Sequence, residues 1–218
     1  YIYLYIPLVT MGLMSREYAS GSIKLLYSSP VKNSSIILGK FLSMVVYGGV
    51  LIGIIALFAL FTFIFTPNFD YPIVLVGLLG LYLLILAYSA IGIFFSSLTK
   101  YQVVAAIGTL AALAFLNNVS DIGRKSDLIR DITYWLDLSG KSRSFLNGIF
   151  SSQDFLYFII VIVLFLSLSI FKLNTEKSIM STRTKVLKYF AIVGVSLVCG
   201  YVTTFPKLKY YYDATHTQ

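Results

Sequence analysis

The sequence has 218 residues, of which 58% are apolar and 12% are charged, and its mean hydropathy is +0.84. A soluble domain is about 45–50% apolar and about 25% charged, so this composition excludes an ordinary soluble enzyme and a disordered, charge-rich tail. The net charge of +8 does not indicate a nucleic-acid partner, because membrane proteins place surplus basic residues on cytoplasmic loops. The composition therefore indicates a protein whose surroundings are the lipid membrane.

Long uncharged runs predict membrane-spanning helices, because a bilayer core of about 30 Å needs about 20 apolar residues in a helix. We expect an all-α, polytopic transmembrane helical bundle. The predicted spans are about 1–14, 41–65, 73–98, 103–116, 155–171 and 189–204. The first run is short and opens at Tyr1, so we expect the sequence to be N-terminally truncated, a piece of a longer protein.

Lys and Arg are distributed unevenly among the loops that join these spans. The loops 15–40, 99–102 and 172–188 hold ten basic and two acidic residues. The loops 66–72, 117–154 and 205–218 hold seven of each. Because basic loops remain in the cytoplasm, the first set is predicted to be cytoplasmic and the second external, in the inner membrane of a bacterium.

The sequence offers few candidates for a catalytic, metal-binding or nucleotide-binding site. Cys199 is the single cysteine and His216 the single histidine, which excludes a metal cluster built on these residue types. The stretch 140–142 (Gly-Lys-Ser) resembles the end of a phosphate-binding loop, but the glycine required five residues earlier is Trp135. The spans hold no acidic residue and no histidine, so an intramembrane enzyme is not expected. We expect no catalytic, metal or cofactor site in this chain.

The cytoplasmic segment 15–40 contains an apolar cluster of Ile23, Leu25, Leu26 and Tyr27. Ser22 is placed to cap a short helix. That helix is expected to end near Ser29-Pro30, because the residue before a proline disfavours helical geometry. Periodicity alone leaves two interpretations open. The helix either rests on lipid headgroups, anchored by the lysines at 24 and 32, or docks a partner protein.

The run Pro7–Lys40 resembles the signature of type-2 ABC transporter (ABC-2) permeases. The likeness lies in Gly-Ser-Ile-Lys-Leu-Leu at 21–26, Ser-Pro-Val at 29–31 and Ile-Leu-Gly-Lys at 37–40. A second block at 86–107, with a Ser-Ser-Leu-Thr turn, resembles the fourth and fifth helices of that family. Among its members the chain most resembles gliding-motility (Gld-type) and nitrous-oxide-operon permeases. The resemblance extends over most of residues 1–177.

The resemblance implies that residues 1–173 are an ABC permease domain and that 15–40 holds a coupling helix for an ATP-binding subunit. Two copies of that subunit would bind ATP and Mg²⁺, and a second permease copy or a homologue would complete the complex. The implied coupling residues are Arg16, Glu17, Ser22, Ile23, Lys24, Leu25, Leu26 and Tyr27, with Ile23, Leu26 and Tyr27 as anchors and charges at the rim. The chain departs from the family pattern in having a single acid, Glu17, before the glycine and Lys24 in place of the usual glutamate.

The external loop 117–154 carries an approximate helical stripe that includes Ile132, Trp135 and Leu136 beside Tyr134. Two interpretations are open: an interfacial helix with its aromatic residues at headgroup depth, or a lid over an exit path. In the family that the chain resembles, this stretch re-enters the outer leaflet. Most glycines of the spans are expected to be packing residues, and a hinge role is an alternative for the Gly48-Gly49 pair. These glycines are Gly48, Gly49, Gly53, Gly77, Gly80 and Gly92.

Residues 174–188 form a basic cytoplasmic linker to the run 189–204, which is one helix more than ABC-2 permeases usually have. The stretch that follows, 205–218, resembles the start of the auxiliary Gld-type protein, whose large domain is external. We therefore expect either a permease fused to an auxiliary subunit or a plain extra anchor helix. The predicted function is a permease that moves an unidentified substrate with energy from a partner. The alternative is a complex that transmits force or a signal and transports no cargo.

Overall fold

The computed structural model describes residues 2–28, 31–65, 71–123, 138–177, 187–196 and 211–213. These residues are mostly helical, with one short antiparallel strand pair. In chain order the elements are α1 (Ile2–Thr10), α2 (Gly12–Ser20), α3 (Ile23–Ser28), α4 (Asn33–Phe65), α5 (Tyr71–Leu98), α6 (Gln102–Gly123), α8 (Leu138–Leu146), β1 (Ile149–Ser151), α9 (Ser152–Lys177) and β2 (Tyr211–Asp213). A further apolar helix covers Leu187–Ser196.

Three of the described helices are long and apolar enough to cross a membrane: α4, α5 and residues 152–175 of α9. At 1.5 Å per residue, the 33 residues of α4 reach about 50 Å, well beyond a bilayer core of about 30 Å. The apolar helices Gln102–Asn118, within α6, and Leu187–Ser196 are shorter. The chain is thus an all-α transmembrane bundle.

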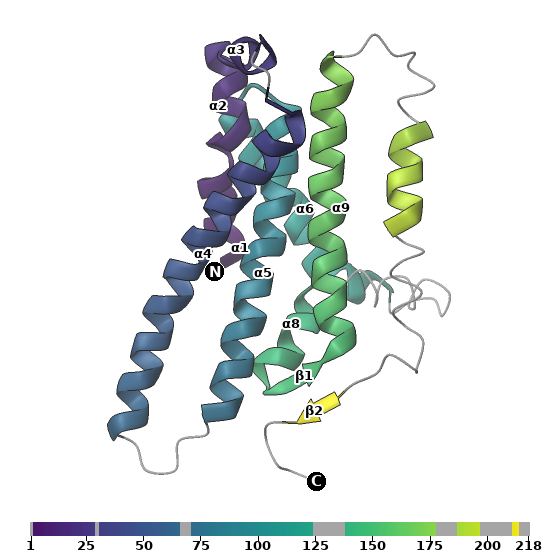
Figure 1. Ribbon diagram of the computed structural model, residues 1–218. Coiled ribbons are helices and arrows are strands. Elements are labelled where there is room, and N and C mark those ends of the chain that lie inside the picture. The colour runs from purple at the N-terminus through teal and green to yellow at the C-terminus, as the bar shows by residue number, and fades with distance from the viewer. Residues whose placement is uncertain are drawn as a thin grey trace.

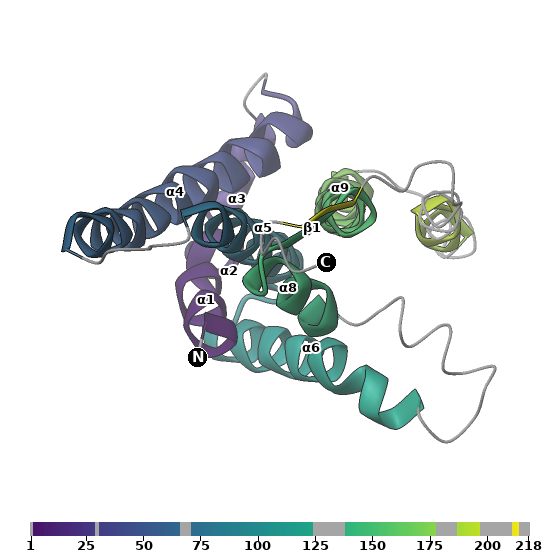
Figure 2. The ribbon, with the colours of Figure 1, turned by 90° about the horizontal axis from the view of Figure 1, so that it is seen from below.

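Helix α5 lies at the centre of the bundle, where α1, α2, α4, α6, α8 and α9 all contact it (Figure 2). Its residues 83–93 are buried without interruption, which explains why this stretch is apolar on every side. Helix α4 is the opposite case. Large apolar side chains cover its exposed half, including Val50, Phe58 and Phe61, as expected of a helix that faces lipid.

Two glycines of α5 allow neighbouring helices to approach closely. A Cβ at Gly92 would lie 2.0 Å from Thr10 Oγ1 of α1, and one at Gly80 would lie 2.2 Å from the Cβ of Phe145 in α8. Real Cβ atoms do not come so near to another heavy atom. The packing role predicted for these two glycines is therefore confirmed.

The glycines of α4 divide into two groups. A Cβ at Gly48 would lie 3.1 Å from Ile85 of α5, so this glycine also belongs to a helix contact. A Cβ at Gly49 or Gly53 would meet no atom within 4 Å. These two exposed glycines therefore make no close helix contact within the described chain.

Helix α9 runs between the two ends of the bundle, and a strand pair lies at one of them (Figure 1). Helix α9 begins beside β1 and runs toward the end of the bundle where α3 lies (Figure 1). Strand β2 pairs antiparallel with β1, so that Ile149 faces Asp213 and Ser151 faces Tyr211. The chain is therefore back at the β1 end of the bundle at Tyr211–Asp213.

Several boundaries differ from those expected from hydropathy. The first apolar run is divided between α1 and α2, and α4 begins eight residues before the predicted span 41–65. Helix α4 starts early because its first two turns are amphipathic. The uncharged apolar run stops at the Lys and Ser residues of these turns, although the backbone there is still helical. The predicted residues Ile132, Tyr134, Trp135 and Leu136 lie outside the described residues.

Candidate functional site

The candidate site is the α3 end of the bundle, and its first component is the junction between α1 and α2. Met11 separates the two helices and gives α2 no side-chain cap. Instead, the Ser96 hydroxyl of α5 accepts hydrogen bonds from the backbone N–H groups of Met14 (3.0 Å) and Ser15 (3.1 Å). It donates to the carbonyl of Met11 at 2.8 Å. A side chain from a distant helix therefore caps α2, whose first N–H groups have no partner within the helix.

The second component is the turn from α2 to α3. Gly21 ends α2 with φ +74°, a left-handed conformation that glycine adopts without strain, and its N–H donates to the carbonyl of Tyr18. The hydroxyls of Ser20 and Ser22 lie 2.8 Å apart, and Ser22 Oγ donates to the carbonyl of Glu17 at 3.4 Å. Ser22 was predicted to cap the helix that follows it, but its hydroxyl is directed to the end of the preceding helix.

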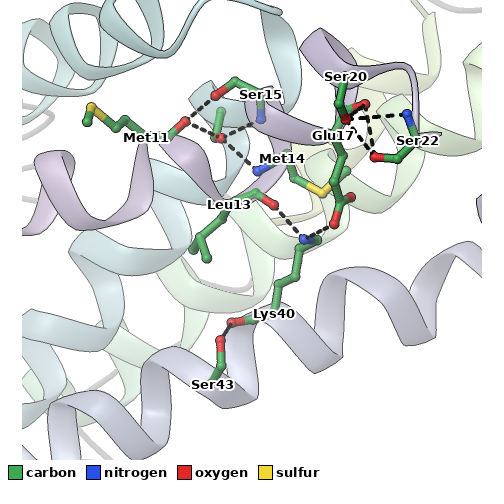
Figure 3. Close-up of polar contacts among 10 residues, drawn as sticks. Met11, Leu13, Met14, Ser15, Glu17, Ser20, Ser22, Lys40 and Ser43 are labelled. Carbon is green, nitrogen blue, oxygen red and sulfur yellow. Dashed lines mark hydrogen bonds and ion pairs between the residues drawn. The ribbon is translucent and has the colours of Figure 1, made fainter.

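The third component is an ion pair between α2 and α4. Lys40 Nζ lies 2.6 Å from Glu17 Oε1 and also donates to the carbonyl of Leu13 (Figure 3). The two side chains are only 19% and 27% exposed. Lys40 therefore ties both turns of α2 to α4, across a sequence separation of 23 residues. Glu17 was predicted to be a rim charge toward a partner, whereas the structure pairs it within the chain.

Helix α3 has an inner and an outer side. Ile23 is 7% exposed and belongs to the bundle's own core together with Met14 and Ile37. Leu25 is 73% exposed, and Lys24 is exposed as well. The left-handed turn at Gly21 separates α2 from α3, and the first residue of α3, Ile23, lies inward. The expected partner anchor at Ile23 is therefore corrected, and Leu25 is the described apolar side chain that α3 presents outward.

The remaining predicted coupling residues are distributed around this helix. Arg16 is exposed on α2, with its guanidinium beside Gly12. Leu26 and Tyr27 lie in α3, but their side chains are outside the described residues. Two residues of the site were not singled out from the sequence, Lys40 and Ser96. Both lie inside the blocks that carry the family resemblance. Lys40 ends the Ile-Leu-Gly-Lys motif and Ser96 begins the Ser-Ser-Leu-Thr turn, so these motifs could have pointed to both residues.

The opposite end of the bundle contains a helix inserted between spans. Helix α8 packs on α5 through Phe145, whose buried ring contacts Phe150 and Phe158. Lys141 of α8 pairs with Asp154, in the first turn of α9, at 2.9 Å. The resemblance to a phosphate-binding loop at 140–142 therefore falls inside a helix, with the lysine directed to a carboxylate. Among the described residues no group of three or more His, Cys, Asp or Glu is placed to hold a metal ion.

Comparison with known proteins identifies the family. A family model described as ABC-2 family transporter protein matches residues 2–124, which is more than half of the chain. The match contains α1 to α6 and thus the whole α3 end. No curated protein and no solved structure matches the chain. With its membrane-spanning helices and this match, the chain belongs to the ABC-2 family of transporter proteins.

Proposed function

We propose that this chain is the permease subunit of an ATP-binding cassette transporter, which moves a substrate across the inner membrane of a bacterium. Membership of the ABC-2 family supports the general function. The observation that carries the proposal is the construction of the α3 end. A short helix with exposed Lys24 and Leu25 follows directly on α2, and α2 is bonded to α4 and α5 by buried or half-buried polar contacts. A push on α3 thereby reaches two long membrane helices.

The partner in this proposal is an ATP-binding subunit, present in two copies, which binds ATP and Mg²⁺. Leu25 supplies an apolar anchor on the exposed side of α3, and the exposed Arg16 of α2 and Lys24 of α3 supply a basic rim in this proposal. A basic rim implies acidic residues at the facing edge of the ATP-binding subunit. Leu26 and Tyr27 extend the anchor in the proposal because they follow Leu25 in the same helix.

The mechanism follows from differential binding. Two permeases, either identical copies or homologues, enclose a path between them, and the ATP-bound motor binds one arrangement of the α3 ends better than the other. Hydrolysis reverses that preference, so the path opens alternately to each side. The positive loops support placing the α3 end in the cytoplasm. The pairing of β2 with β1 supports placing residues 211–213 on the opposite side, together with α8.

Co-purification with the candidate ATP-binding subunit tests the proposal. Leu25→Asp places a charge in the anchor and should weaken the complex by about 2 kcal/mol, roughly thirtyfold in affinity. Tyr101→Asp is the matched control, because Tyr101 is also 73% exposed and lies in the α5–α6 turn at the same end of the bundle. Equal affinity of both variants, together with a Leu26→Asp variant that also binds normally, would refute docking on α3.

A second function has one observation in its favour. Strand β2 attaches the part of the chain after the helix Leu187–Ser196 to β1, next to α8. If that part continues into an external auxiliary domain of the Gld type, movement of α8 would pull on it. ATP hydrolysis would then transmit force across the envelope without a cargo. Reconstitution in liposomes separates the two functions, because only the transporter produces ATP-dependent efflux.

A further inference from the structure

The hydroxyl of Ser96 occupies the point where three chain segments meet. It is completely buried and makes all its described hydrogen bonds to the backbone at the α1–α2 junction: to the N–H groups of Met14 and Ser15 and to the carbonyl of Met11. A hydroxyl has one donor and two acceptor positions, so these bonds use its full capacity. Met11, at the N-cap position of α2, makes no side-chain cap of its own.

A second contact on the same side of α5 reinforces this junction. Gly92 and Ser96 are four residues apart and so lie on one face of the helix. At Gly92 the last residue of α1, Thr10, approaches so closely that no side chain would fit. Helix α5 thus offers a close-contact position and a polar cap, one turn apart, to the junction from which α2 and α3 extend.

We infer that Ser96 is a positioning residue for energy coupling, which holds α2 on α5 so that displacement of α3 is passed to the centre of the bundle. The inference rests on the proposed function. Helix α2 has only nine residues, and an isolated helix of that length is marginal. Its orientation therefore depends on contacts at its ends. The Lys40–Glu17 pair fixes it to α4, and Ser96 fixes it to α5.

The neighbouring Ser97 provides a matched control. It is also buried, at 1% exposure, but its hydroxyl donates to the carbonyl of Phe94 inside α5 at 2.6 Å. Ser96→Ala and Ser97→Ala remove the same atom from adjacent positions, and only the first removes a bond between helices. Ser96→Thr keeps the hydroxyl and serves as the conservative variant.

The first measurement is hydrogen exchange of the whole chain in detergent. Loss of the cap should accelerate exchange of the Met14 and Ser15 amides roughly fivefold (about 1 kcal/mol) in Ser96→Ala. Ser97→Ala should leave these amides unchanged. Unchanged exchange of both amides in Ser96→Ala would overturn the assigned contact.

The second measurement reports on coupling. A fluorophore on Leu146→Cys, an exposed position of α8, is followed in proteoliposomes that contain the ATP-binding subunit, with Cys199→Ser to remove the native thiol. We expect MgATP to change the signal in the otherwise unaltered chain and in Ser97→Ala, and Ser96→Thr to retain most of the change. Ser96→Ala should lose it while the complex still assembles and hydrolyses ATP.

The outcomes distinguish this inference from the proposed function. If the otherwise unaltered chain responds to MgATP and Ser96→Ala responds equally, Ser96 is merely structural and the inference is overturned. If Ser96→Ala fails to assemble with the ATP-binding subunit, the positioning role is overturned in favour of a folding role. If the unaltered chain itself neither binds the subunit nor responds to MgATP, the proposed function fails, and the coupling role fails with it.

Discussion

Replacing Gly80 with alanine should push α8 away from the centre of the bundle. The added Cβ would lie 2.2 Å from the Cβ and 2.7 Å from the Cγ of Phe145, whose side chain is completely buried. Carbon atoms in contact lie about 3.5–4.0 Å apart, so α8 has to move by roughly 1 Å or more. Overpacking of this kind costs about 1–3 kcal/mol. We expect the melting temperature of the protein in detergent to fall by about 2–4 °C for each kcal/mol.

Gly53→Ala is the control for this prediction. A Cβ at Gly53 meets no atom within 4 Å, so the substitution should be neutral or stabilise α4 by about 0.5–1 kcal/mol through helix propensity. A double variant sharpens the test. Phe145→Ala should not restore stability to Gly80→Ala, because the nearest atom is the Cβ of Phe145, which alanine retains. If Gly80→Ala melts at the temperature of Gly53→Ala, the close packing of α8 on α5 is refuted.

Two further predictions concern the ends of the bundle. Glu17→Gln and Lys40→Met should each destabilise the protein by about 1–3 kcal/mol. Each substitution leaves the other half-buried charge of the pair without its partner. The double variant Glu17→Lys with Lys40→Glu should recover part of the stability that the two single reversals lose, as measured by melting temperature. If the effects of the two single reversals simply add in the double variant, the ion pair is contradicted. Phe150→Cys with Tyr212→Cys, in a chain without Cys199, should form a disulfide on mild oxidation, because antiparallel partners have Cα atoms about 4.5–5.5 Å apart. Absence of the cross-link on gel electrophoresis would contradict the return of the chain to β1.

Much of the architecture could be predicted from composition and hydropathy. The apolar runs 41–65 and 73–98 lie within α4 and α5, and the run 155–171 lies within α9. The bilayer imposes this correspondence, because a segment in lipid has to satisfy its own backbone hydrogen bonds and expose apolar side chains. The glycines at 80 and 92 were recognised as packing positions for the same reason, since small residues bring helices together in lipid.

The site was predicted less completely. Segment 15–40 was recognised, but Ile23 was assigned to the partner surface although it lies in the bundle's own core. A six-residue helix has too few turns for periodicity to tell which apolar side faces inward. The roles of Lys40 and Ser96 depend on contacts across 23 residues and across 81 to 85 residues of sequence, which local patterns do not report.

The sequence alone therefore determined the three long apolar helices and the loops that carry the positive charge, because transfer into lipid depends on each segment's own composition. Tertiary structure decided which helix occupies the centre, which side of α3 remains available, and which hydroxyl caps α2. In lipid, helices are selected as neighbours by close fit and by polar bonds between them, and not by hydrophobicity, which all of them share. Those properties arise only when segments distant in the sequence are brought together.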